Sequence, residues 1–285
     1  MPDHAAAAGE GPGFLYDGYV FDLDGTIYLG DELLPGAGRL LTRLRGLGRR
    51  VVFVSNNPTH DPEMYAEKLR RLGVEASVTE ILNTVVTMTR WLVRNHPDAT
   101  VFPIAEAPLC RALAEAGIRT SDRPGEIDLV VASYDRGFDY RKLQIAFDAI
   151  WYHRRARLVA TNLDRWCPFP GGRGEPDAGA IVAAIEACTG ATCEVNAGKP
   201  DPLMLDAAVE LLGLEVGDCL MVGDRLYTDI AMAVDAGIDS ALVLTGDSTR
   251  EQVHRLPPHH RPEFVLDRID ELLASVEADR GMARR

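Results

Sequence analysis

The sequence has 285 residues, enough for one large or two ordinary domains. Hydrophobic residues make up 46% and charged residues 26%, which is typical of a soluble globular protein. The formal net charge is −13, which disfavours nucleic acid or an anionic membrane as a partner, because both require clustered basic side chains. A small anionic substrate is not excluded, since a cation or a metal can reverse the field within one pocket.

The ends of the chain carry no sign of targeting. No apolar stretch approaches the roughly 20 residues of a transmembrane helix. The first 13 residues, MPDHAAAAGEGPG, lack the basic start and the long apolar run of a signal peptide. We therefore expect a cytoplasmic protein with a disordered tail over residues 1–13 and a second tail over residues 278–285.

Strand-like and helix-like segments alternate along the chain. The predicted strands are Tyr19–Asp22, Val51–Ser55, Val101–Ile104, Leu129–Ser133, Leu158–Thr161, Cys219–Gly223, Ala241–Thr245 and Phe264–Leu266. The predicted helices are Gly36–Leu47, Pro62–Leu72, Val85–Asn95, Pro108–Ala116, Tyr140–Tyr152, Ala178–Cys188, Pro202–Leu212 and Thr228–Ala236. This alternation predicts an α/β protein with a parallel sheet and helices on both of its faces.

The first predicted strand ends in two acids, Asp22 and Asp24, which are followed by Gly25 and Thr26. Carboxylates are costly to bury unless they are paired or bind a metal, so a contribution to stability does not explain their presence here. Ligands of open α/β sheets bind at the carboxyl ends of the strands. Gly25 is expected to end the strand and to leave room for a phosphoryl group against backbone N–H groups. These residues therefore predict an active site.

The second predicted strand ends in Ser55, Asn56 and Asn57. Ser55 offers a hydroxyl group and Asn56 a backbone N–H to a phosphate oxygen. The same Ser-Asn-Asn-Pro pattern is also typical of a helix N-cap, so both interpretations stay open.

One lysine stands apart from the other basic residues. The chain has only three lysines, and Lys68 and Lys142 fall in predicted helices, where they look like surface residues. Lys199 lies between Gly198 and Pro200, outside any predicted helix. A compact ammonium group suits a site in which one cation must contact both a carboxylate and a phosphate oxygen.

The predicted strand Cys219–Gly223 ends in Asp224. Together with Asp22 and Asp24, this residue can supply the hard oxygen ligands that Mg²⁺ prefers. Asp229 begins the next predicted helix, where it can cap the helix or support the metal site.

The acid-rich strand ends lie in the two outer parts of the chain. The middle segment has strands of its own but no comparable acid cluster. We therefore predict a core domain over residues 14–82 and 192–277, with a second α/β domain over residues 83–191 inserted between them.

The remaining candidate motifs are weak. Five cysteines are scattered without a metal-binding spacing, and we expect most of them to be buried apolar residues. His254, His259 and His260 flank a Pro-Pro pair and are predicted to lie in a solvated loop. The sequence has no Walker A loop, no Rossmann glycine motif after the first strand, and no Gly-x-Ser-x-Gly motif.

Taken together, the motifs resemble those of the haloacid dehalogenase-like (HAD) superfamily, and within it the NagD-like, 4-nitrophenylphosphatase-type branch (subfamily IIA). The four motifs, in order, are Asp22-Leu-Asp24-Gly25-Thr26, Ser55, Lys199 in Gly-Lys-Pro-Asp-Pro, and Gly223-Asp224 with Thr228-Asp229. The resemblance covers about residues 14–275, and the segments 29–37 and 160–164 also resemble this branch.

The resemblance implies a doubly wound, Rossmann-like core with an α/β cap of the C2 type. It implies that Asp22 is the nucleophile and Asp24 the general acid and base. It further implies that Mg²⁺ is held by the Asp22 side chain, the Asp24 main-chain carbonyl and Asp224, with Asp229 in support. Phosphoryl binding is assigned to the remaining motif residues, Gly25, Thr26, Ser55, Asn56, Asn57 and Lys199.

The inserted domain departs from the family pattern at one position. The branch often has Pro-Gly-x-Gly-Ala near the substrate, whereas this chain has Asp177 after Pro176. Asp177 can contact a polyol or cationic group of the substrate, or it can cap the following helix. Arg165 and Trp166 are further candidates for substrate contacts in the cap.

The sequence thus predicts a Mg²⁺-dependent phosphatase for small phosphomonoesters, such as sugar or polyol phosphates, that acts through an aspartyl-phosphate. Two alternatives stay open: phosphoryl transfer to a small alcohol, and a catalytically silent binding protein of the same fold. The expected partner is a small phosphorylated metabolite, with no nucleic acid and no membrane. Relatives often dimerise through the cap, so a homodimer is also expected.

Overall fold

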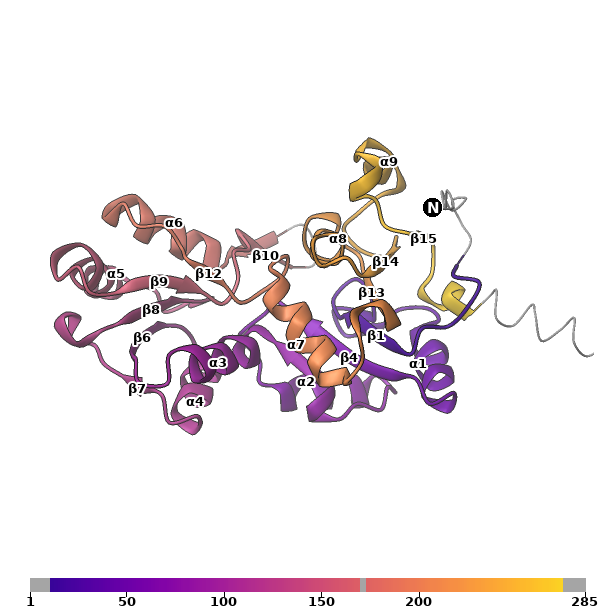
Figure 1. Cartoon of the computed structure of the whole chain (residues 1–285), viewed down its shortest axis with the longest axis horizontal. Coiled ribbons are helices and arrows are strands. Elements are labelled where there is room, and N and C mark those ends of the chain that lie inside the picture. The colour runs from indigo at the N-terminus through magenta and orange to yellow at the C-terminus, as the bar shows by residue number, and fades with distance from the viewer. Residues whose placement is uncertain (1–10, 170–172, 274–285) are drawn as a thin grey trace, which may run out of the picture. The chain divides into compact units, whose positions relative to one another are not determined.

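The computed structural model describes residues 11–169 and 173–273. The described chain divides into two compact units. Unit 1 comprises the described residues of Met1–Val54, Tyr65–Leu82 and Leu205–Arg285, and unit 2 those of Ser55–Met64 and Asn83–Met204. Each unit is built on a sheet of its own (Figure 1).

Unit 1 contains a six-stranded sheet with the strand order β15-β14-β13-β1-β4-β5. Its strands are β1 (Gly18–Asp22), β4 (Arg50–Ser55), β5 (Ile81–Asn83), β13 (Cys219–Gly223), β14 (Asp239–Val243) and β15 (Phe264–Leu266). Strand β1 pairs in parallel with both β4 and β13. The chain runs outward from β1 through β4 and returns beside β1 as β13. The topological switch point, where such sheets bind ligands, therefore lies between β1 and β13.

Helices pack on both faces of this sheet. The helices of this part of the chain are α1 (Ala37–Gly46), α2 (Pro62–Arg71), α7 (Pro202–Leu212), α8 (Ala231–Ala236) and α9 (Arg250–Arg255). On one face, Tyr19 and Phe21 of β1 share a buried cluster with Leu40 and Leu44 of α1. On the other face, a smaller cluster joins Leu242 of β14 to residues that follow β13 and to α9. A short hairpin, β2 (Tyr28–Leu29) and β3 (Glu32–Leu33), follows β1.

Unit 2 contains a five-stranded sheet with the order β12-β9-β8-β6-β7. Its strands are β6 (Thr100–Ile104), β7 (Arg119–Thr120), β8 (Leu129–Ala132), β9 (Arg157–Ala160) and β12 (Val195–Asn196). Its helices are α3 (Thr84–Asn95), α4 (Ala107–Glu115), α5 (Tyr140–Phe147) and α6 (Ala178–Thr189). An antiparallel hairpin, β10 (Trp166–Phe169) and β11 (Arg173–Pro176), precedes α6.

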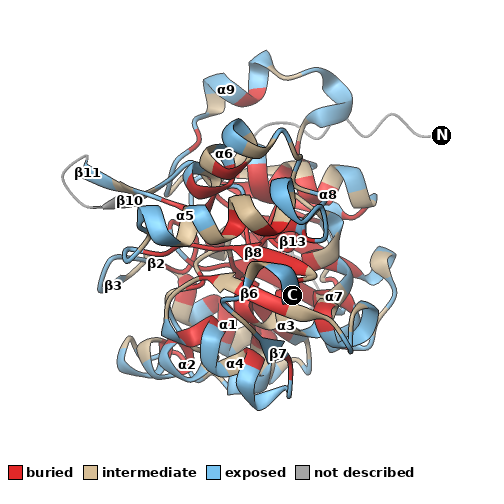
Figure 2. Cartoon of the chain, turned by 90° about the vertical axis from the view of Figure 1, so that its left-hand side faces the viewer, coloured by how far each residue is buried: buried red, intermediate tan, exposed pale blue. Residues whose placement is uncertain are grey.

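Alternate residues of the central strands explain this layering. Val130 and Ala132 of β8 pack with residues of α5 and α6, whereas Leu129 and Val131 pack with residues of α3 and α4. Strand β8 is therefore buried along its whole length (Figure 2). The predicted α/β class, with parallel sheets and helices on both faces, is confirmed.

Several local predictions differ from the structure. The predicted helix Thr228–Ala236 is a π-helical segment, Leu226–Ile230, followed by α8. Helix α9 includes His254, which was expected in a loop. Pro12 is buried, so the predicted N-terminal tail is too long, while residues 1–10 and 278–285 lie outside the described residues.

The prediction of mostly buried cysteines was wrong. Only Cys219 is buried, because it lies in the central strand β13. Cys167 and Cys193 are half-buried, and Cys110 and Cys188 are exposed. Within the described part of the chain, no helix combines the length and the apolar character needed to cross a bilayer.

The division into units differs from the predicted domain boundaries. Residues 55–64 and 192–204 cluster with unit 2, whereas the sequence assigned them to the core. The functional assignment of the two parts as catalytic core and cap stays a prediction.

Candidate active site

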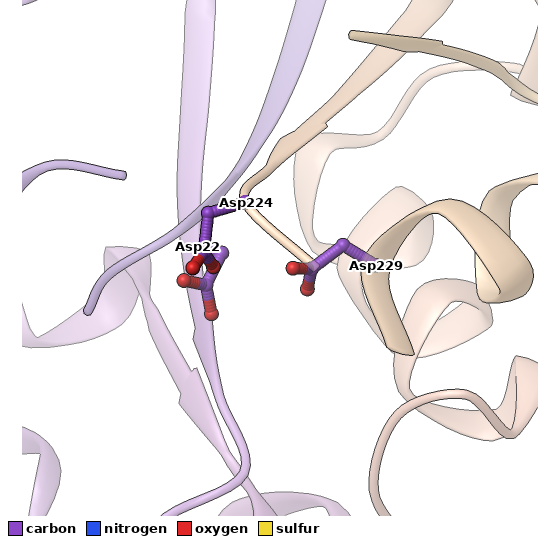
Figure 3. Close-up of side chains that lie close together, drawn as sticks. All are labelled: Asp22, Asp224 and Asp229. Carbon is purple, nitrogen blue, oxygen red and sulfur yellow. The ribbon is translucent and has the colours of Figure 1, made fainter. Parts of the chain in front are cut away.

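Three aspartates of unit 1 come together at the switch point of its sheet. Asp22 is the last residue of β1, Asp224 follows the neighbouring strand β13, and Asp229 lies in the π-helical segment after it. One carboxylate oxygen of each residue lies within 4.8 Å of one oxygen of each of the other two. Figure 3 shows Asp229 extending toward the other two carboxylates from a separate segment. Asp22 of the first motif and the two acids of the fourth motif therefore form one cluster.

The cluster is buried, which makes it costly without a counter-charge. Asp22, Asp224 and Asp229 are 7%, 2% and 0% exposed. Two unit charges at such distances repel each other by roughly 3–4 kcal/mol at an effective dielectric constant near 20. Carboxylate oxygens are the ligands that Mg²⁺ prefers, and that ion combines a few of them with water and a substrate phosphate. The donor set therefore fits Mg²⁺.

One cation of the chain already acts on this cluster. Burial lowers the pKa of the Arg225 guanidinium, but the charges of Tyr227, Asp22, Asp224 and Asp229 outweigh it and raise the pKa above its ordinary value. Arg225 thus stays protonated and compensates part of the negative charge. The sequence analysis did not identify this residue, although it directly follows Asp224 in the fourth motif.

Backbone segments without side chains enclose the carboxylates. A Cβ atom at Gly25 or at Gly246 would overlap the Asp224 carboxylate, and one at Gly223 would overlap Asp229. Gly25 also has a positive φ of 83°, which favours glycine. These three glycines let the main chain approach the acids closely, and they fix where the oxygens lie.

The loop after β14 also holds Asp224, and the sequence analysis missed it. The N–H of Asp247 donates to Asp224 Oδ2 at 2.7 Å. The Ser248 N–H donates to the Asp224 carbonyl at 3.2 Å, and the Thr245 hydroxyl donates to the Gly25 carbonyl at 2.7 Å. The signal was present as the polar run Thr-Gly-Asp-Ser after a buried strand, but Thr245 was assigned to the strand itself.

Asp24 lies in a tight turn and, unlike Asp22, is exposed. In this turn the Gly25 N–H donates to the Tyr28 carbonyl at 2.8 Å, and the Thr26 N–H donates to the Leu23 carbonyl at 3.3 Å. Both N–H groups are therefore used within the turn. The Thr26 hydroxyl makes no hydrogen bond with the described residues, and phosphate binding by Gly25 and Thr26 stays a prediction.

In unit 2, Asn56 connects the second and third motifs. Its Oδ1 accepts a hydrogen bond of 2.7 Å from the Lys199 N–H, and its Nδ2 donates to the Lys199 carbonyl at 3.1 Å. Nδ2 also donates to Asp164 at 3.1 Å, and the Asn56 carbonyl accepts from Asn162 at 3.1 Å. The Asn56 side chain thus fixes the main chain of Lys199. Segment 160–164, noted only for its family resemblance, supports this arrangement.

Lys199 is 4% exposed and follows a glycine that no other residue can replace easily. A Cβ at Gly198 would lie 2.8 Å from both Asn56 Oδ1 and the Thr161 carbonyl. Asn196 holds this glycine on both sides: its Oδ1 accepts from the Gly198 N–H and its Nδ2 donates to the Gly198 carbonyl. Lys199 was predicted from the sequence, whereas the supporting role of Asn196 was not.

Ser55 does not cap a helix. It is 5% exposed, and its hydroxyl accepts a hydrogen bond of 3.2 Å from the Asn57 N–H. Asn57 in turn accepts from the N–H and the hydroxyl of Thr59. Helix α2 begins only at Pro62. The N-cap interpretation of this segment was wrong, and the segment forms consecutive turns.

The three predicted cap residues differ in their surroundings. Arg165 and Trp166 are exposed, the latter at the start of the β10–β11 hairpin. Asp177 is buried and accepts a hydrogen bond of 2.6 Å from the Ala178 N–H as the N-cap of α6. The capping interpretation of Asp177 is therefore confirmed, whereas substrate contacts by all three residues stay predictions.

Comparisons with known proteins agree with this fold. A family model described as haloacid dehalogenase-like hydrolase matches residues 19–119, and a HAD-hydrolase-like model matches residues 196–272. The sugar-phosphatase AraL of Bacillus subtilis is 35% identical over 260 residues, which cover 91% of this chain and 93% of the relative.

Two solved structures are similar to this chain over about nine tenths of its length. The 4-nitrophenylphosphatase from Thermotoga maritima has a TM-score of 0.84 and 34% identity, over 91% of this chain and 97% of that chain. NagD from E. coli has a TM-score of 0.82 and 25% identity, over 90% and 98% of the two chains. The chain therefore belongs to the haloacid dehalogenase-like hydrolases, in the NagD-like, 4-nitrophenylphosphatase-type branch.

Proposed function

We propose that this protein is a Mg²⁺-dependent phosphatase that hydrolyses small phosphomonoesters, such as sugar or polyol phosphates, through an aspartyl-phosphate. Membership of this family and branch makes the chain a HAD-type phosphoric monoester hydrolase. The observation that carries the finer proposal is the buried cluster of three carboxylates at the switch point of the unit 1 sheet. A sugar-phosphatase among the relatives supports the substrate class.

The proposed reaction has two steps that share the same pair of acids. A carboxylate oxygen of Asp22 attacks phosphorus and forms the acyl-phosphate bond. The bond from phosphorus to the substrate oxygen breaks, and Asp24 gives its proton to that oxygen. A water molecule then attacks phosphorus, Asp24 takes up the proton of the water, and Asp22 leaves as a free carboxylate. Phosphate and an alcohol are the products.

In this proposal the other site residues bind the metal ion or hold the phosphoryl group in place. Asp22, Asp224 and the Asp24 main-chain carbonyl would hold Mg²⁺, with Asp229 in support. The ion would offset the negative charge of the acids and the phosphoryl group. The phosphate-binding residues keep their predicted role, which rests on the family resemblance: Gly25, Thr26, Ser55, Asn56, Asn57 and Lys199.

The nucleophile assignment is tested with 4-nitrophenyl phosphate. We expect Mg²⁺-dependent hydrolysis that stops on addition of EDTA and is absent in Asp22→Asn, because an amide cannot form the acyl-phosphate. Full activity of this variant would refute the assignment of Asp22.

Metal binding is tested without turnover. Mg²⁺ at about 100 times its Kd should stabilise the fold by about 2.7 kcal/mol and raise the melting temperature. Asp224→Asn should lose that shift. An equal shift in this variant would argue against the proposed ligand set.

The remaining expectations concern the setting of the enzyme. We keep a cytoplasmic location and a homodimer formed through the predicted cap domain, residues 83–191, as proposals. Light scattering after size-exclusion chromatography tests the dimer, since a mass near 31.1 kDa would indicate a monomer.

A further inference from the structure

Tyr28 is a buried tyrosine that the proposed mechanism does not yet use. Its side chain is 0% exposed, and its hydroxyl makes no hydrogen bond of standard geometry with the described residues. An enclosed hydroxyl without a full partner loses about 1–3 kcal/mol of hydrogen bonding. A substrate cannot reach a group that is this deeply buried. The hydroxyl therefore requires an acceptor within the protein.

The backbone of the turn ties Tyr28 to Asp24. The two residues form a β-bridge, and the N–H between them, that of Gly25, donates to the Tyr28 carbonyl at 2.8 Å. The Tyr28 N–H donates to the Leu23 carbonyl at 3.2 Å and closes the turn. Tyr28 is thus held at a fixed position relative to the main chain of Asp24.

The acids around Tyr28 identify the acceptor. Burial raises the pKa of Tyr28 well above its ordinary value, and the charge of Asp24 contributes more to the rise than those of Tyr65 and Asp22. Asp24 also acts on the phenol as a hydrogen-bonding group. Asp24 itself is exposed, so its carboxylate needs an anchor if it is to reach a leaving group reproducibly.

A lysine lies on the face of the same ring. The Lys68 Nζ is 3.7 Å from the centroid of the Tyr28 ring, within the range of a cation–π interaction. A positive charge on the ring face draws electron density from the phenol and makes its O–H a better donor. Lys68 was expected to be a surface residue. It is instead half-buried, because its side chain packs over the Tyr28 ring.

From this geometry we propose that Tyr28 is a positioning residue, whose hydroxyl donates a hydrogen bond to the Asp24 carboxylate, with Lys68 strengthening that donor. The inference rests on the proposed function, because it concerns the acid–base role of Asp24. Hydrogen bonds of catalytic groups are often long before the substrate binds and shorten in its complex. Tyr28 keeps its proton, and it orients the second oxygen of Asp24 toward the leaving group.

The test uses two substrates of nearly the same shape. Nitrophenolate leaves without help from a proton, whereas the poorer leaving group of phenyl phosphate depends on general acid catalysis. In Tyr28→Phe, kcat/KM should fall about tenfold for phenyl phosphate, as expected for loss of one hydrogen bond to a charged group, and stay within about twofold for 4-nitrophenyl phosphate. Lys68→Met should show a smaller selective loss of kcat/KM for phenyl phosphate. Lys68→Arg, which keeps the positive charge, should keep kcat/KM close to that of the unsubstituted protein.

The control variant is Tyr19→Phe, since Tyr19 is equally buried but its hydroxyl accepts from the Tyr16 N–H within unit 1. It should leave the ratio of the two substrates unchanged. Equal losses for both substrates in Tyr28→Phe, or no loss for either, would overturn the role of Tyr28. Failure of the unsubstituted protein to hydrolyse either ester would instead count against the proposed phosphatase.

Discussion

Close approach of the main chain determines how the buried acids of unit 1 are presented. Glycines at positions 25, 223 and 246 lie where any side chain would overlap Asp224 or Asp229. The carboxylates are thus fixed by backbone atoms, which move less than side chains do. Even the smallest substitution at such a glycine should change the geometry of the acids.

Gly246→Ala tests this argument. The added methyl group has to displace the Asp224 carboxylate or break its 2.7 Å hydrogen bond from the Asp247 N–H. We expect the Mg²⁺ concentration for half-maximal activity to rise about tenfold or more, in line with the 10–100-fold effects of groups that orient metal ligands. The matched control is Gly217→Ala, where a Cβ would meet nothing within 4 Å. Identical Mg²⁺ dependence in both variants would contradict the argument.

Asn56 offers a second test at the level of one side chain. In Asn56→Ala, the N–H and the carbonyl of Lys199 lose their partners of 2.7 and 3.1 Å. We expect kcat/KM to fall by about 10–100-fold, because a misplaced catalytic group costs about that much. Asn95→Ala is the control, since its exposed amide donates only to the Trp91 carbonyl. Steady-state kinetics that do not distinguish the two variants would rule out this role for Asn56.

Helix α6 shows how a residue that looks functional can have an element-level role. Asp177 replaces a glycine usual in this branch, and its carboxylate accepts from the first N–H of the helix. Side chains at this position satisfy donors that the helix itself cannot pair. The departure from the family pattern therefore stabilises the start of α6.

Asp177→Ala should lower the free energy of unfolding by about 1 kcal/mol, whereas Asp177→Ser should retain most of it. Chemical denaturation with the slope held constant measures both. Asp139→Ala, which removes the N-cap of α5, should produce a loss of similar size. An unchanged midpoint for Asp177→Ala would show that its carboxylate does not stabilise the helix.

The sequence was most informative where a buried strand meets a charged residue. Asp22 and Asp224 could be placed because apolar periodicity predicts a strand and its end, and parallel strands end at the same edge. Asp229 was expected either to cap a helix or to support the metal site, and the structure shows that a π-helical segment brings its carboxylate into the cluster. Contacts of this kind depend on backbone geometry that residue types do not reveal.

Residues that act through their main chain were the ones missed. Gly246 contributes a Cα without a side chain and Asp247 contributes its N–H, and the pattern of residue types predicts neither contact. The prediction of buried cysteines was wrong because residue type does not say which face of a helix a side chain occupies. Cys110 and Cys188 lie on the outer faces of α4 and α6, whose inner faces are formed by other residues.

For the molecule as a whole, stability should fall in alkaline solution. Burial raises the pKa of the Cys193 and Cys219 thiols to about 11, and it raises that of the Tyr19 phenol well above its ordinary value. Unfolded thiols and phenols ionise near 9.0 and 10.0, so the unfolded chain then loses protons that the folded chain keeps. The contribution of these groups to the free energy of unfolding is therefore fully present below pH 9, and it decreases as the pH rises toward 11 and beyond.

Thermal unfolding between about pH 8 and pH 10.5 checks this expectation. The melting temperature should fall over that range, and Cys219→Ala should reduce the fall, because this variant has one thiol fewer to ionise in the unfolded chain. Tyr16, Tyr28 and Tyr134 should add to the fall, because burial also raises the pKa of these phenols in the folded chain. A melting temperature independent of pH would contradict the assignment.

The division of the chain also limits how it can be recombined with its relatives. The polypeptide passes between the units four times, at 54/55, 64/65, 82/83 and 204/205. Two of these junctions fall inside α2 and α7. A chimaera that exchanges only residues 83–204 would leave residues 55–64, with Asn56, to the recipient, and would join foreign halves within α7. Grafting of unit 2 therefore requires the cut within α2 and the cut within α7 to be moved to the loops outside these helices, so that Asn56 and Lys199 are transferred together.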